Sequence, residues 1–141
     1  MGTVRTAIDT NILSALLTGE VNAAEIGQSL DTAGNRGGLV VCPIVYIELR
    51  AAPGASVSLI DLFLERTSIV VDWNMDKEIW HLAAERYQRY AVRKRKQKMG
   101  EPKRLVADFI VGAHALLRAD LLLTLDPRPY RRDFAELSLH P

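Results

Sequence analysis

The chain has 141 residues, of which 48% are hydrophobic and 25% are charged, and its formal net charge is +1. This length predicts a single domain spanning residues 1–141, with a sizeable core. No apolar run approaches the roughly 20 residues that cross a bilayer, and the first residues lack the pattern of a signal peptide. The single cysteine, Cys42, excludes an intramolecular disulfide and a cysteine-rich zinc site. We therefore expect a cytoplasmic protein that is not embedded in a membrane.

Strand-like and helix-like segments alternate along the chain. Short apolar runs predict strands at residues 4–8, 39–42, 69–71 and 121–124, and a candidate edge strand at 137–139. Helical spacing of apolar residues predicts helices at 12–17, 22–33, 43–52, 56–66, 77–98 and 105–119, and a short turn or helix at 130–134. The alternation predicts an α/β fold in which helices cover both faces of a mainly parallel sheet of four to five strands.

Four acidic residues lie at the edges of these apolar segments: Asp9, Glu48, Asp108 and Asp126. Asp9 and Asp126 directly follow predicted strands, whereas Glu48 and Asp108 lie in predicted helices. Ligand sites of parallel sheets lie outside the carboxyl ends of the strands, so all four could converge at one edge. Carboxylates beside so much apolar surface are costly unless something compensates them, and a divalent metal ion would do so. The pattern therefore indicates a hydrolytic metal site.

Each acid also has a purely structural interpretation. Asp9 precedes a helix and could simply be its N-cap, and Asp126 before a proline has the same appearance. Glu48 could be a solvated helix residue. Asp108 could be a favourable charge near a helix amino end. The sequence leaves these interpretations open beside the catalytic one.

Four short segments, in order along nearly the whole chain, carry a family pattern. They are residues 8–14 (IDTNILS), 43–49 (PIVYIEL), 107–115 (ADFIVGAHA), and 123–126 (LTLD) together with 132–134 (RDF). This series resembles the motifs of PIN-domain ribonucleases, especially the VapC-type toxins of bacterial toxin–antitoxin pairs. The closing motif departs from the pattern, since many relatives have Asn where this chain has Asp126. The fourth acid is either Asp126 or Asp133, and Asp126 is favoured because it follows its strand immediately.

The resemblance implies a three-layer α/β/α fold, Mg²⁺ or Mn²⁺ at the acids, endonucleolytic cleavage of RNA, a cognate antitoxin and a homodimer. The predicted catalytic residues are Asp9, Glu48, Asp108 and Asp126. Asp9 and Asp108 are the predicted principal metal ligands, because Mg²⁺ prefers a few hard oxygen ligands and keeps several waters. Three further residues are predicted to hold the carboxylates or a phosphate through hydrogen bonds: Thr10, Asn11 and Thr124.

A basic segment suits the substrate that the resemblance implies. Half of the 18 basic residues fall between Arg86 and Arg104. Lys and Arg contacts to phosphates give largely sequence-independent affinity. The predicted RNA-binding residues are Arg93, Lys94, Arg95, Lys96, Lys98 and Lys103. Tyr87 and Tyr90 either stack on bases or pack inside the domain. A solvated helix face explains the basic run equally well.

Rival functions are less well supported by the residues. A phosphatase of the haloacid dehalogenase type needs a second acid where this chain has Asn11. A response-regulator receiver could use Asp72, after the third predicted strand, but needs an early acidic pair that does not accompany Asp9. The alternative that remains is a catalytically degenerate PIN-like module that binds RNA or a protein. The presence of all four acids favours an enzyme.

Overall fold

A computed structural model of the chain describes residues 2–97 and 104–140. Within them, five strands form one sheet with the order β3-β2-β1-β4-β5. The strands are β1 (Thr6–Ile8), β2 (Leu39–Val41), β3 (Ile69–Val71), β4 (Leu121–Leu123) and β5 (Leu139–His140). Each neighbouring pair is parallel. The prediction of a mainly parallel sheet is confirmed.

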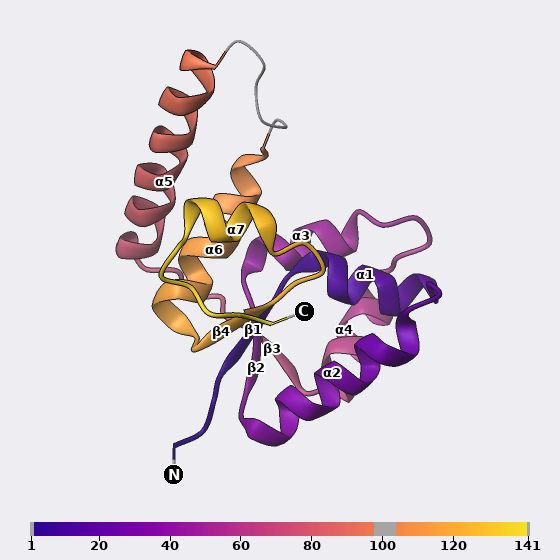
Figure 1. The fold of residues 1–141 in the computed structure, drawn as a ribbon. Helices are drawn as coiled ribbons and strands as arrows, with labels where there is room; N and C mark the ends of the chain where they lie inside the picture. Colours follow the sequence, from indigo (N-terminus) through magenta and orange to yellow (C-terminus); the bar gives the residue numbers. More distant parts are fainter. Residues whose placement is uncertain (1, 98–103, 141) are drawn as a thin grey trace.

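Helices cover both faces of this sheet. They are α1 (Thr10–Thr18), α2 (Ala23–Arg36), α3 (Pro43–Arg50), α4 (Val57–Arg66), α5 (Lys77–Lys96), α6 (Val106–Arg118) and α7 (Arg128–Asp133). The connections from β1 to β2 and from β2 to β3 step one way across the sheet, and the connection from β3 to β4 steps back. Right-handed crossovers therefore place α1 to α4 on one face and α5 and α6 on the other. Figure 1 shows this division, and the three-layer α/β/α prediction is confirmed.

Some predicted boundaries were wrong by one to three residues. The first strand begins at Thr6 rather than at residue 4, and the last one is Leu139–His140 rather than 137–139. The last strand is shifted because its ladder bonds run from Leu122 N–H to the Ser138 carbonyl and from Thr124 N–H to the His140 carbonyl. The long helix ends at Lys96, and the predicted end at residue 98 lies outside the described residues.

The order in which strands are added to the sheet changes direction at β1. Strands β2 and β3 lie on one side of β1, and β4 and β5 lie on the other. Asp9 follows β1 directly, and its N–H donates to the carbonyl of Leu123, the last residue of β4, at 3.0 Å. The carboxyl ends of two strands that diverge in this way form the usual ligand crevice of an open α/β sheet. The fold therefore places Asp9 at the position where a site is expected.

Close packing fixes α7 above this edge of the sheet. Phe134 follows α7 and is 1% exposed, and its ring centroid lies 6.2 Å from that of Phe109 on α6. A Cβ atom at Gly112 would overlap the Phe134 ring, so only glycine admits this approach. The contact anchors the carboxyl end of α7 and thereby positions the residues just before it.

Candidate functional site

Asp9 lies at the centre of the site and is 9% exposed. Its Oδ1 accepts from the Thr10 N–H at 2.8 Å, so Asp9 is indeed the N-cap of α1. Its Oδ2 accepts from Thr124 Oγ1 and from Tyr130 OH, each at 2.9 Å. Burial raises the pKa of Asp9; the three hydrogen bonds lower it in part, and the charge of Asp108 raises it further. The capping role leaves Asp9 a desolvated carboxylate held only by neutral donors.

Thr124 and Asn11 connect the two strand ends around Asp9. The fully buried Thr124 donates to Asp9, and its Oγ1 accepts from the Asp126 N–H at 3.2 Å and from Asn11 Nδ2 at 3.4 Å. Asn11 Oδ1 accepts from the Leu125 N–H at 3.2 Å. The network ties the start of α1 to the segment after β4. It therefore restrains the orientation of the Asp9 carboxylate, the kind of support predicted for these two residues.

Thr10 links Asp9 to a second acid. Its N–H donates to Asp9, and its Oγ1 donates to Glu48 Oε1 at 2.6 Å. Glu48 is an exposed residue of α3, and this bond directs its carboxylate toward the start of α1. The structure therefore brings Glu48 and Asp9 together through one intervening threonine.

Asp108 lies in the first turn of α6 with a side chain that is 38% exposed. It is near enough to Asp9 for its charge to raise the pKa of Asp9. Its Oδ2 accepts from Arg104 Nε at 3.3 Å. The Arg104 guanidinium also lies over the rings of Phe109 and Tyr130, at 5.2 and 5.9 Å from their centroids. A mostly buried arginine thus stands beside Asp108.

The two candidates for the fourth acid have different surroundings. The Asp133 side chain is 2% exposed, and its two oxygens accept from Arg93 and Arg104, both at 2.9 Å. The Asp126 side chain is 50% exposed, and its Oδ1 accepts from Arg128 Nε at 3.3 Å. Asp126 does not cap α7, so that structural interpretation was wrong. Because both oxygens of Asp133 are already in ion pairs, the geometry favours Asp126.

The protein groups at this site supply only some of the ligands that a hard divalent cation needs. Among the described residues, no three or more His, Cys, Asp or Glu side chains form a group that could hold a metal ion. Asp9 and Asp108 nevertheless offer carboxylate oxygens near enough to each other for the charge of Asp108 to raise the pKa of Asp9. Mg²⁺ is commonly bound through one or two carboxylates, with waters and substrate phosphates completing its coordination. Asp9 has no ion-pair partner within the described part of the chain, so a cation there would compensate its desolvation.

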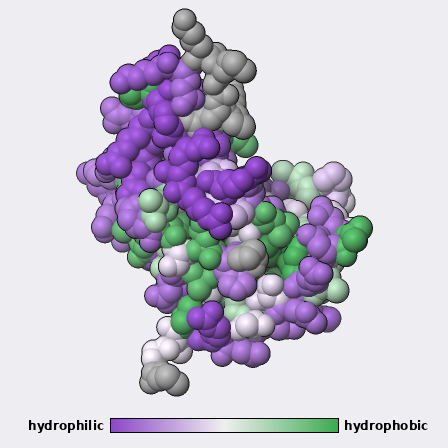
Figure 2. All heavy atoms as spheres, in the orientation of Figure 1, coloured by the Kyte–Doolittle hydropathy of each residue, from purple (hydrophilic) through white to green (hydrophobic). Residues whose placement is uncertain are grey.

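The predicted RNA-binding residues lie partly within the described chain. Arg93, Lys94, Arg95 and Lys96 form the last turn of α5, whereas Lys98 and Lys103 lie outside the described residues. Figure 2 shows that the upper part of α5 presents a mainly hydrophilic surface. This end of the helix is joined to the site, because Arg93 pairs with Asp133, which in turn pairs with Arg104.

Tyr87 and Tyr90 pack inside the domain. Their ring centroids lie 5.2 and 5.5 Å from that of Phe109, and Tyr90 is 3% exposed. The Tyr90 hydroxyl accepts from the Arg104 N–H at 2.8 Å. The packing interpretation of Tyr90 is correct, since a buried ring cannot stack on a base.

Two residues of the site were missed by reasoning from sequence. Arg104 stands four residues before Asp108, and this helical spacing of opposite charges could have indicated the pair. Tyr130 is separated from Asp9 by 121 positions, and no local pattern links the two. Its role became visible only when the packing of α7 was known.

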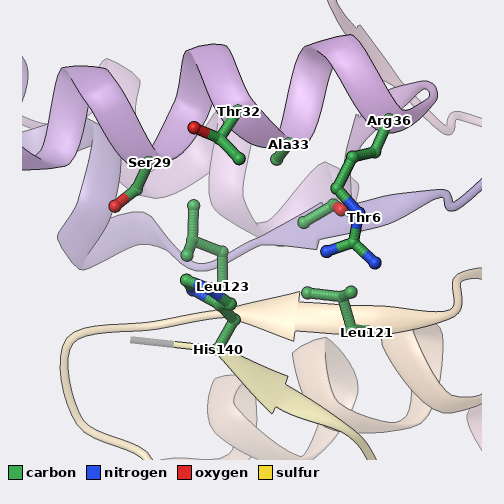
Figure 3. A pocket seen from close by; sticks show the side chains of 8 residues that line it. All are labelled: Thr6, Ser29, Thr32, Ala33, Arg36, Leu121, Leu123 and His140. Atoms are coloured by element: carbon green, nitrogen blue, oxygen red, sulfur yellow. The ribbon is translucent and has the colours of Figure 1, made fainter.

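A hollow lies between α2 and strands β4 and β5 (Figure 3). Its lining combines hydroxyl groups, one arginine, one histidine and apolar side chains: Thr6, Ser29, Thr32, Ala33, Arg36, Leu121, Leu123 and His140. It contains no carboxylate, so the predicted hydrolytic chemistry has no counterpart there. The functional assignment therefore rests on the edge that carries Asp9.

Comparison with known families identifies the fold. The model of the PIN domain matches residues 6–135. The chain belongs to the PIN domain family. No curated protein sequence matches it significantly. In the described part of the chain, no helix is long and apolar enough to cross a membrane.

Three solved structures are similar to this PIN domain over most of their length. VapBC2 from Rickettsia felis bound to a promoter DNA fragment has 18% identity and a TM-score of 0.70, with 96% of this chain and 97% of that chain covered. VapBC-1 from nontypeable Haemophilus influenzae has 21% identity and a TM-score of 0.68, with 96% of each chain covered. A toxin–antitoxin complex from Klebsiella pneumoniae has 18% identity and a TM-score of 0.64, with 89% of each covered. At these identities the likeness concerns the fold.

Proposed function

We propose that this PIN domain is an endoribonuclease that depends on Mg²⁺ or Mn²⁺ and cleaves RNA phosphodiester bonds. Membership of a nuclease family supports the broader class, a hydrolase acting on nucleic acid. The observation that carries the proposal is the Asp9 carboxylate, which is buried, next to Asp108, and held by neutral donors alone. Such an arrangement is costly without a cation and useful with one.

Asp9 and Asp108 would hold the metal ion, and Glu48 and Asp126 would complete the site directly or through water. The bound ion would polarise the scissile phosphate and lower the pKa of a coordinated water. The protein's own contribution is orientation. Thr10, Asn11 and Thr124 restrain the acids.

The proposal extends to partners. Similar folds occur in structures described as VapBC assemblies and as a toxin–antitoxin complex, which supports the proposal that this chain is the toxin of a type II pair with a cognate antitoxin. We also propose a homodimer acting in the cytoplasm, and RNA binding at the basic end of α5. Affinity from such phosphate contacts should decrease steeply as salt is raised.

A catalytically degenerate module is the second candidate. It is favoured by the absence of a metal-holding group of three acids among the described residues and by the Arg104–Asp108 pair. In that case the domain would bind RNA or a protein partner without cutting. The nuclease should cleave RNA when Mg²⁺ or Mn²⁺ is added, whereas the degenerate module should not cleave RNA with or without metal.

The purified chain should be incubated with mixed structured RNAs in Mg²⁺, Mn²⁺ or EDTA, beside Asp108→Asn. As a matched control, Asp31→Asn makes the same change at an exposed residue of α2. We expect metal-dependent cleavage that Asp108→Asn lowers by at least about a hundredfold and Asp31→Asn leaves unchanged. Metal binding without cleavage would indicate a narrow substrate or a missing partner. An absence of both would support the degenerate module.

A further inference from the structure

Tyr130 has contacts that no predicted catalytic role explains. It is 3% exposed, and its hydroxyl donates to Asp9 Oδ2 at 2.9 Å. The buried hydroxyl is therefore a donor to this carboxylate oxygen in the folded chain.

The two oxygens of Asp9 differ in the acceptor capacity that they retain. Oδ2 accepts two hydroxyl donors, from Thr124 and Tyr130, which use both of its lone pairs. Among the described residues, Oδ1 accepts the Thr10 N–H alone, which leaves one of its lone pairs. A cation would consequently find one available oxygen on Asp9, and this oxygen is on the side that Tyr130 does not contact.

The rest of the structure holds Tyr130 in this position. The Phe134 ring, packed on Gly112, anchors the end of α7. The Arg104 guanidinium lies 5.9 Å from the Tyr130 ring centroid, and Arg104 is itself held by Asp108 and Asp133. The packed rings and ion pairs around Tyr130 therefore fix the position of its hydroxyl next to Asp9.

We propose that Tyr130 is a positioning residue that occupies Asp9 Oδ2 and thereby makes Asp9 a one-oxygen ligand, through Oδ1, for the divalent cation. The inference rests on the proposed metal-dependent function. It assigns a task to a residue outside the four acidic motifs. Partners that orient metal-binding carboxylates typically change metal affinity by about 10- to 100-fold when they are removed.

The test is Mn²⁺ binding to the full chain, measured by calorimetry and by the electron paramagnetic resonance signal of the bound ion, without RNA. Tyr130→Phe keeps the ring beside Arg104 and removes only the hydroxyl. Tyr87→Phe, on α5, makes the same change at a ring that packs on Phe109 away from Asp9. We expect Tyr130→Phe to weaken Mn²⁺ binding about tenfold or more and to alter the signal, and Tyr87→Phe to leave both unchanged.

A second variant examines whether one oxygen atom mediates the effect. Thr124→Val removes the other donor to Oδ2, so its effect on Mn²⁺ affinity should not add to that of Tyr130→Phe. Strict additivity, or wild-type affinity in folded Tyr130→Phe, would overturn the inference while leaving the metal site intact. A wild-type chain that binds no Mn²⁺ would overturn both the proposed function and this inference.

A measurement on the wild-type chain does not require the variants to fold. Adding Mg²⁺ should shift the nuclear magnetic resonance signals of the Tyr130 ring and leave those of Tyr87 unchanged. Tyr130 signals that stay constant while Mg²⁺ binds would contradict the inference.

Discussion

The two ends of α6 hold carboxylates in different ways. At its amino end, Asp108 is near enough to Asp9 to raise its pKa, and the described residues that donate hydrogen bonds to Asp9 are all neutral. Toward its carboxyl end, Asp72 Oδ2 lies 3.0 Å from His114 Nε2 and accepts from Arg118 at 3.3 Å. Arg118 also pairs with Asp76 at 2.6 Å. Thus Asp72 contacts a cationic side chain directly, whereas none of the described residues gives Asp9 such a contact.

This difference indicates that Asp9 gains more from a bound cation than Asp72 does. Asp72 Oδ2 already contacts both His114 and Arg118, whereas Asp9 is desolvated and accepts from neutral donors. The receiver interpretation gave Asp72 a chemical role, but in the structure Asp72 connects the β3–α5 segment to α6. Three pairs of substitutions test the comparison.

The largest expected difference is in cleavage. Asp9→Asn should reduce metal-dependent RNA cleavage by at least about a hundredfold, because it removes a ligand of the ion. Asp72→Asn should leave cleavage within about twofold, because it removes only structural contacts. Initial rates at saturating Mg²⁺, with folding checked by circular dichroism, measure both. Equal losses would show that the two ends of α6 do not differ in function.

The next difference is in stability. Arg104→Met should lower the free energy of unfolding by about 3 kcal/mol, because it leaves Asp108 unpaired and Asp133, 2% exposed, with Arg93 alone. Arg118→Met should cost less, because its side chain is 27% exposed and that of Asp76 is 55% exposed. Urea denaturation at neutral pH compares the two. A larger loss for Arg118→Met would reverse the ranking of the clusters.

The smallest expected effect depends on pH. Burial lowers the pKa of His114 below its ordinary value of 6.5, although Asp72 opposes the shift and Arg5 and Arg118 assist it. Below pH 6.5 the unfolded chain therefore binds a proton that the folded chain does not. The free energy of unfolding decreases as the pH is lowered from 6.5, until the pH reaches the lowered pKa of His114. His114→Gln should remove this slope, and His81→Gln at an exposed site of α5 should keep it. Unfolding free energies between pH 7.5 and about 5 provide the measurement.

The fold and two of the predicted acids, Asp9 and Asp108, could be predicted from local sequence pattern. Apolar periodicity located the strands and helices to within a few residues, because burial of one face is a local property of the sequence. Asp9 and Asp108 were recognisable for the same reason, since each stands next to an apolar segment. The alternation of strands and helices predicted the mainly parallel sheet, and the family resemblance implied the three-layer α/β/α fold.

Contacts between distant segments could not be predicted in this way. Asp126 follows its strand as Asp9 does, yet its carboxylate faces Arg128 and solvent. Tyr90 stands in a basic segment that suggests nucleic-acid binding, but its ring is buried against Phe109. The side of a helix that faces the core depends on the elements that pack against it. The basic residues beside Tyr90 in the chain do not specify that side.

The sequence by itself located the strands and helices to within a few residues, and therefore the edge of the sheet where Asp9 lies. Only the tertiary structure decided how each acid is held: Asp9 by Tyr130, Asp108 by Arg104, and Asp133 by two arginines. The physical reason is that backbone position follows from local hydrophobic pattern. The partners of a side chain, and hence its charge and free lone pairs, depend on segments that meet only in the folded chain.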